Sequence, residues 1–265
     1  MTRFRSLGRS RTMAVGKTVL ALLAVGFILF SGTERLGYHW QWYRVPQYLV
    51  GAMDGGLVMG PLLKGLVVTL QITGLSLVLS LVLGLVSALF RLSGSVVARA
   101  VSRAYLETIR NTPLLVQIFF LYFVASPVLG MGRFASAILA LSLFEGAYIS
   151  EIIRAGILSV PKGQWDAAFS IGMGRLDAYR SVILPQAVRH ALPPLTGQAV
   201  SLIKDSALVS TIAVYDLTMQ AQAIIAETYL TFELWFTVAA VYLIMTLSLS
   251  MAASFMERRF RMKGT

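Results

Sequence analysis

The sequence predicts an all-α membrane protein with six transmembrane helices and a polar helical segment on the cytoplasmic side. Three observations support this fold class. Of the 265 residues, 57% are hydrophobic and only 13% are charged, whereas a soluble domain carries about 25% charged residues. Apolar stretches of about 20 residues, the length of a spanning helix, recur along the chain. Basic residues gather between alternate stretches, as they do on the cytoplasmic side of membrane proteins.

Six stretches are long and apolar enough to span a bilayer. They cover residues 14–31, 62–90, 105–127, 134–156, 192–213 and 232–256. The mean hydropathy of the whole chain is +0.73, which is typical of a protein whose surroundings are largely lipid.

The basic residues indicate the orientation of these spans. If the N-terminus is cytoplasmic, most basic residues fall on the cytoplasmic side, before the first span, in alternate connections and after the last span. The outer side receives only Arg35, Arg44, Lys64 and Arg133, while Lys204 lies within a span. The sequence therefore predicts that both termini are cytoplasmic. This distribution also explains the net charge of +11 without a nucleic-acid partner.

Residues 1–61 form a separate N-terminal region. A basic start followed by the apolar stretch 14–31 indicates an uncleaved signal-anchor helix, and a cleaved signal peptide is the alternative. The segment 32–61 is rich in aromatic residues, which favour membrane interfaces. They are Tyr38, Trp40, Trp42, Tyr43 and Tyr48. We expect this segment on the outer surface, partly on the bilayer, with a glycine-rich bend before Pro61.

The composition excludes several kinds of site. The chain has no cysteine and only two histidines, His39 and His190, so it has no thiolate metal or redox site and no His-rich metal site. Gly16-Lys17-Thr18 imitates the end of a phosphate-binding loop, but Arg11 stands where the first glycine is required and no strand precedes it. We expect no cofactor or metal in this chain and no enzyme activity of its own.

A polar stretch interrupts the apolar pattern between the fourth and fifth spans, so residues 157–191 are expected in the cytoplasm. Residues at helical spacing predict one short helix there: Trp165, Ala168, Phe169 and Gly172. Gly172 and Gly174 then permit a sharp turn, and a second helix is expected over 176–182, ended by Pro185. The apolar faces of these helices either dock another protein or pack back onto the bundle.

The same stretch resembles the signature loop of permease subunits of ATP-binding-cassette importers. That signature reads Glu-Ala-Ala, three residues, Gly, nine residues, Ile-x-Leu-Pro. The corresponding residues here are Asp166, Ala167, Ala168, Gly172, Val182, Leu184 and Pro185, of which Asp166 and Val182 are conservative departures. Within that family, the segments RNTPLLVQ (110–117), AYISEIIRAG (147–156) and KDSAL (204–208) resemble the polar amino-acid permeases.

The resemblance covers residues 62–260 and implies a five-span permease core, so that the helix at 14–31 is an addition and 261–265 is a cytoplasmic tail. It implies a subunit of a bacterial inner-membrane importer for a polar amino acid. The implied partners are two ATPase subunits, which bind ATP and Mg²⁺, a second permease subunit and a periplasmic binding protein. The loop is then a coupling helix that inserts into the ATPase. The candidate contact residues are Trp165, Asp166, Ala167, Ala168, Gly172, Leu184 and Pro185.

Ionisable residues near the bilayer midplane mark functional sites because a charge in lipid is costly. Glu145, Lys204 and Asp205 lie in the fourth and fifth spans, about 16–18 Å from a helix end. In one interpretation Lys204 binds the α-carboxylate of an amino acid, and Glu145 or Asp205 binds its α-ammonium group. In the other, Glu145 and Lys204 form an internal pair, which either stays closed or opens for the substrate. Glu151 and Arg154 are candidates for a gate or a support of the loop.

Two other functions stay open at the level of sequence. An ion-coupled secondary transporter also explains the midplane charges, but it does not explain the polar loop, and no inverted repeat is visible. A non-transporting scaffold subunit would tolerate the loss of these charges. The amino acid carried, and whether the second permease subunit is a copy of this chain or a relative, are likewise open.

Overall fold

The computed structural model describes residue 20, residues 38–53 and residues 56–261. The chain divides into two compact units, Met1–Trp42 and Tyr43–Thr265, and the helices discussed below belong to the second. The expected first span, 14–31, lies outside the described residues apart from Leu20, as does most of the tail at 261–265. A sixth span therefore stays a prediction.

An antiparallel hairpin precedes the first described span. The elements here are η1 (Trp42–Arg44), α2 (Pro46–Leu49), β1 (Val50–Met53) and β2 (Gly56–Met59). The strands pair with Val50 opposite Met59. The sequence predicted only a bend, although the Asp54-Gly55 pair between the strands is a strong hairpin signal. Gly60 lets the hairpin return against α2, because a β-carbon there would clash with the Tyr48 carbonyl group.

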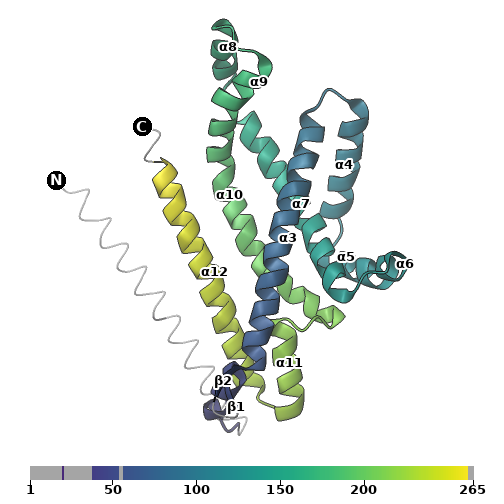
Figure 1. The fold of residues 1–265 in the computed structure, drawn as a ribbon, viewed down its shortest axis with the longest axis vertical. Coiled ribbons are helices and arrows are strands. Elements are labelled where there is room, and N and C mark those ends of the chain that lie inside the picture. Colours follow the sequence, from purple (N-terminus) through teal and green to yellow (C-terminus); the bar gives the residue numbers. More distant parts are fainter. Residues whose placement is uncertain (1–19, 21–37, 54–55, 262–265) are drawn as a thin grey trace, which may run out of the picture. The chain divides into compact units, whose positions relative to one another are not determined.

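Helices α3 (Pro61–Leu92) and α7 (Arg133–Leu158) pack side by side along most of their length (Figure 1). They confirm the predicted spans at 62–90 and 134–156. Small residues allow this close approach: a β-carbon on Gly84 would lie 2.5 Å from Ile149 Cγ2. The buried polar residues of α3 are hydroxylated, and Thr73 donates to the Thr69 carbonyl oxygen at 2.8 Å, so that few polar groups are left unsatisfied in lipid.

The predicted span at 105–127 is wrong as a single straight helix. The chain instead forms α4 (Val96–Arg110), then α5 (Leu114–Phe119), η2 (Phe120–Ala125) and α6 (Ser126–Leu129), with a bend of 107° after α4. Pro113 explains the break because it has no amide hydrogen and disfavours helical geometry in the preceding residue. The Gln117 side chain braces the corner by donating to the Ile109 carbonyl oxygen at 2.8 Å.

The polar stretch forms two short helices, as predicted, and then continues into the next long helix. The elements are α8 (Lys162–Ser170), α9 (Arg175–Ala178), the π-helix η3 (Tyr179–Ile183), α10 (Leu184–Asp205) and η4 (Ser206–Ile212). The prediction that Pro185 ends a helix is wrong. Pro185 lies in the first turn of α10, where its missing amide hydrogen is not needed, so α10 starts earlier than the predicted span at 192–213.

The chain ends in α11 (Leu217–Thr228) and α12 (Thr231–Arg261), which agrees with the predicted span at 232–256. Among the described residues, three helices are long and apolar enough to cross a membrane, and counting each bent pair as one span gives five. Of these three, α12 is the most exposed, with 11% of its most apolar window buried. Figure 1 shows α8 and α9 at one end of this unit, beyond the ends of α3 and α4.

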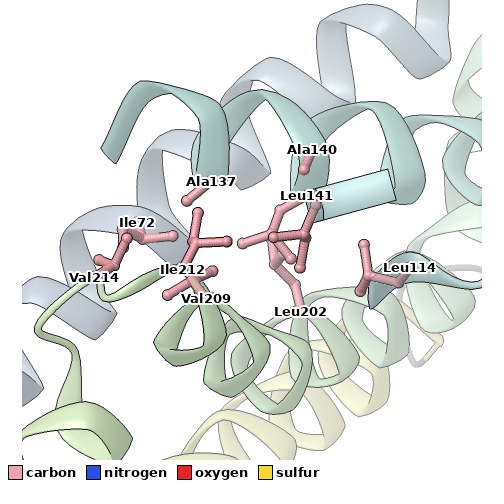
Figure 2. Close-up of a cluster of buried hydrophobic side chains, with 10 residues drawn as sticks. Ile72, Leu114, Ala137, Ala140, Leu141, Leu202, Val209, Ile212 and Val214 are labelled. Atoms are coloured by element: carbon pink, nitrogen blue, oxygen red, sulfur yellow. The ribbon is translucent and has the colours of Figure 1, made fainter. Parts of the chain in front are cut away.

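A buried apolar cluster holds five elements together (Figure 2). Ile72 of α3, Leu141 of α7 and Leu202 of α10 are fully buried in it. Leu114 of α5 and Ile212 of η4 also belong to the cluster. Leu141 and Leu202 lie one helical turn from Glu145 and Gln198, respectively, so the cluster fixes the positions of α7 and α10 beside these two polar residues.

Candidate functional site

A cavity of about 590 Å³ lies between the end of α4 and one face each of α7 and α10. Its lining residues are Arg110, Tyr148, Glu151, Ile152, Ala155, Gly156, Ser159, His190, Pro194 and Gln198. The residues from α7 recur every three or four positions, and those from α10 every four, so each helix contributes a single face. The cavity is open to the surface, since Arg110, Ser159 and His190 are exposed, and its charged and polar groups beside apolar helices make it a candidate binding site.

Glu145 is fully buried one turn beyond Tyr148 on α7. Its Oε2 atom accepts a hydrogen bond from Gln198 Nε2 at 2.5 Å, so the Gln198 amide connects the carboxyl group to the cavity. The Oε1 atom has no hydrogen-bond partner among the described residues. Since a buried carboxyl group normally has its oxygens satisfied, Glu145 has capacity for a further donor. Gln198 was not among the residues singled out from the sequence.

The structure brings Asp205, and not Lys204, toward Glu145. The Asp205 carboxyl group interacts with that of Glu145, while Lys204 is exposed. Consecutive residues of a helix point about 100° apart, so the two cannot face Glu145 together. The Glu145–Lys204 ion pair is absent from the pairs that the described residues form. The binding roles of Glu145, Lys204 and Asp205 stay predictions.

Glu151 and Arg154 belong to a cluster of charges near the C-terminal end of α7. The Glu151 carboxylate pairs with Arg91 at the end of α3 and with Arg154 Nη2 at 3.1 Å. All three side chains are partly exposed, at 23–32%. The cluster therefore ties α3 to α7. The predicted roles of Glu151 and Arg154, in a gate or as a support of the loop, stay predictions, and Arg91 was not singled out from the sequence as a partner of Glu151.

Arg110 occupies the end of α4, where it lines the cavity. Its guanidinium carbon lies 5.6 Å from the centre of the Tyr148 ring, a cation–π contact. Both residues lie in the segments that carry the family resemblance, yet the sequence alone did not single them out. Periodicity could not find them, because the contact joins a helix end to a helix 38 positions further along the chain.

The loop formed by α8 and α9 has an inner and an outer side. On the inner side, Ala168 is 3% exposed, and Trp165 packs edge-on against Tyr179 with ring centres 4.8 Å apart. On the outer side, Ile171 and Leu176 are 74% and 79% exposed. Some apolar residues of the loop therefore pack back onto the bundle while others are exposed, and docking of another protein stays a prediction.

The predicted coupling residues divide between these two sides. Asp166, Ala167, Leu184 and Pro185 are exposed, whereas Trp165 and Ala168 face inward. Gly172 is exposed and has a φ of +83°, a conformation that favours glycine. It forms the turn between α8 and α9, as the sequence predicted. The described residues contain no cluster of His, Cys, Asp and Glu that could hold a metal ion.

Known proteins resemble this chain over most of its length. The profile of the family described as "Binding-protein-dependent transport system inner membrane component" matches residues 80–262. The glutamine transport system permease protein GlnP of Escherichia coli (strain K12) is 40% identical over 204 residues, which cover 76% of this chain and 93% of the relative. The L-cystine transport system permease protein TcyB of Bacillus subtilis (strain 168) is 42% identical over 202 residues, which cover 75% of this chain and 86% of the relative.

Solved structures show the same fold. A chain from the crystal structure of an amino acid ABC transporter with histidines has a TM-score of 0.71 and 41% sequence identity, and the match covers 75% of this chain and 94% of that chain. A chain of the MetNI methionine ABC transporter in an inward-facing conformation has a TM-score of 0.65 at 20% identity, with 76% of this chain and 96% of that chain covered. The second likeness concerns the fold alone.

Proposed function

The chain belongs to the family of inner membrane components of binding-protein-dependent transport systems, and we propose that it is the permease subunit that moves a polar amino acid through an ATP-driven importer. The observation that carries the proposal is the polar cavity between α7 and α10, with Glu145 buried behind Gln198. Glu145 lies about 18 Å along α7 from Arg133, near the middle of a hydrocarbon core about 30 Å thick.

A polar amino acid fits the chemistry of this cavity. The free Oε1 atom of Glu145 and the neighbouring Asp205 carboxyl group are suitable acceptors for an α-ammonium group. Gln198 and His190 offer hydrogen bonds to a polar side chain. The names of the relatives, which refer to glutamine and L-cystine transport, support the same class of substrate. Lys204 is the sequence-based candidate for the α-carboxylate.

The loop of α8 and α9 is the proposed contact with two ATPase subunits, which bind ATP and Mg²⁺. Its outer side presents Asp166, Ala167, Ile171 and Leu176 to solvent, and an exposed apolar patch rimmed by polar groups favours a protein partner. When ATP draws the ATPase subunits together, the loop moves with them and α10 follows. The cavity then opens to alternate sides of the membrane, as alternating access requires.

The remaining assignments complete the proposed assembly. A second permease subunit, either a copy of this chain or a relative, shares the membrane with it, and a periplasmic binding protein delivers the substrate. The protein lies in the bacterial inner membrane with both termini in the cytoplasm, because that orientation leaves most basic residues inside. The apolar stretch 14–31 supplies a sixth span in addition to the five of the core.

Reconstitution tests this function directly. The permease, its cognate ATPase and its binding protein are placed in liposomes, and the uptake of each of the twenty common labelled amino acids is measured with and without ATP. We expect ATP-dependent uptake of one or a few polar amino acids that also requires the binding protein. Uptake driven by an ion gradient without ATP would instead favour a secondary transporter. A complete lack of uptake, with the complex intact, would favour a scaffold.

A further inference from the structure

The charged side chains around the cavity differ in whether they form ion pairs. Glu151 is held by Arg91 and Arg154, so its carboxylate is already neutralised by two guanidinium groups. Arg110 lines the same cavity and interacts electrostatically with Glu151, but the ion pairs within 4 Å among the described residues join Glu151 to Arg91 and Arg154 and not to Arg110. The wall of the cavity therefore carries an excess of positive charge at Arg110.

The Arg110 side chain is exposed, but one ring contacts it and the chain beside it is braced. The Tyr148 ring lies against the guanidinium group, at 5.6 Å from its carbon to the ring centre, and both residues line the cavity. Gln117 fixes the corner that follows α4, because its amide donates to the Ile109 carbonyl oxygen and to Thr112 Oγ1, both at 2.8 Å. A cation that is positioned before its ligand arrives loses less entropy on binding.

We propose that Arg110 binds the α-carboxylate of the transported amino acid in this cavity and thereby selects carboxylate-bearing substrates over amines and amides. The inference rests on the proposed function. A planar guanidinium group can donate two parallel hydrogen bonds to a carboxylate, which a lysine cannot do. Gln198 lines the same cavity and bonds to Glu145. One cavity thus offers a donor for the carboxylate and, through Gln198, access to an acceptor for the ammonium group.

A purely structural role for Arg110 makes a different prediction. A cation in the last turn of a helix is stabilised by the helix dipole, and Arg110 ends α4. Lysine would serve that purpose equally well, and neither residue would then distinguish one ligand from another. Ligand discrimination therefore separates the two roles, whereas a simple loss of transport does not.

The experiment measures binding to the purified permease–ATPase complex in nanodiscs, without the binding protein, which has its own specificity. The probes are the twenty common L-amino acids and their α-carboxamides, which lack the negative charge. In the unaltered complex we expect the transported amino acid to bind at least about 10-fold more tightly than its carboxamide. Arg110→Gln should weaken binding of the amino acid by about 10- to 100-fold and reduce its preference over the carboxamide to nearly one.

Two further variants complete the test. Arg110→Lys retains the charge without the planar fork, so we expect intermediate affinity and intermediate discrimination. Arg103→Gln removes an exposed arginine of α4 that does not line the cavity, and it should leave both unchanged. Equal binding of amino acid and carboxamide by the unaltered complex overturns the inference, whatever the variants do. So does full discrimination in Arg110→Gln, while ATP-dependent uptake by the unaltered protein would still uphold the proposed function.

Discussion

Helix α7 meets its two long neighbours in opposite ways. Toward α3 it is closed: a β-carbon on Gly84 would lie 2.5 Å from Ile149 Cγ2, and one on Gly146 would lie 3.1 Å from Leu83 Cβ. Toward α10 it leaves a cavity of about 590 Å³ lined with polar and charged groups. Because closely packed interfaces deform little, we expect α3 and α7 to move as one body and the change of state to occur between α7 and α10.

Helix α10 is suited to carry that change. It follows the loop of α8 and α9 through the π-helix Tyr179–Ile183 and then contains both Gln198 and Asp205, so one continuous helical path joins the proposed ATPase contact to Glu145. Pro193 and Pro194 lie inside it. A π-turn and interior prolines each interrupt regular hydrogen bonding and mark places where a helix bends. We therefore expect α3 and α7 to form a rigid frame and α10 to move relative to it.

The largest expected effect lies on the closed side. Gly84→Leu inserts a side chain where even a β-carbon meets Ile149, and overpacking of this kind should cost about 3 kcal/mol or more. We expect little folded protein, measured as the monodisperse fraction and the Tm after purification. Gly74→Leu is the matched control, since nothing lies within 4 Å of its added β-carbon. Equal stability of the two variants would contradict the closed arrangement of α3 and α7.

On the side of α7 that faces α10, we expect a substitution to reduce transport rather than stability. Glu145→Gln keeps the shape of the side chain and a partner for Gln198 but cannot neutralise an ammonium group. We expect uptake to fall by about 10- to 100-fold, with an unchanged yield of complex and an unchanged basal rate of ATP hydrolysis. Glu227→Gln, an exposed glutamate on α11, should behave as the unaltered protein. A Glu145→Gln complex that transports normally would remove Glu145 from the site.

The sequence predicted the long spans well but not the contacts between α7 and α10, and the reason is physical. Length and hydropathy located α3, α7 and α12 because a span is a local property of the chain. The turn at Gly172 was also predictable, since a positive φ requires a particular residue at a particular position. The partners of Glu145 were not, because Gln198 and Asp205 reach it only through the packing of α7 against α10. The break at Pro113 and the Asp54-Gly55 hairpin had local signals, but the hydrophobic pattern outweighed them.

A smaller effect is expected where the loop joins the moving side. Gly172→Val forces a β-branched residue into a conformation with φ of +83°, at a local cost of about 1–3 kcal/mol. We expect uptake and substrate-stimulated ATP hydrolysis to fall while the bundle stays folded. Gly163→Val, in a helical position of α8 with no atom near its added β-carbon, is the control. Normal coupling in Gly172→Val would show that the ATPase does not depend on the shape of this turn.

The smallest expected effect is the interaction energy between Glu145 and Lys204 in a double variant. Its size tests whether the two side chains contact each other. Lys204 is exposed, and Glu145 is bound by Gln198 and lies beside Asp205. Residues without shared contacts have additive effects within about 0.5 kcal/mol. We therefore expect the changes in stability and uptake caused by Glu145→Gln and Lys204→Met to add in the double variant. Recovery of uptake in the double variant would support the internal ion pair. If Lys204→Met alone instead lost the discrimination between the amino acid and its carboxamide, Lys204 rather than Arg110 would bind the α-carboxylate. The binding site would then lie at the exposed face of α10 and not in the cavity.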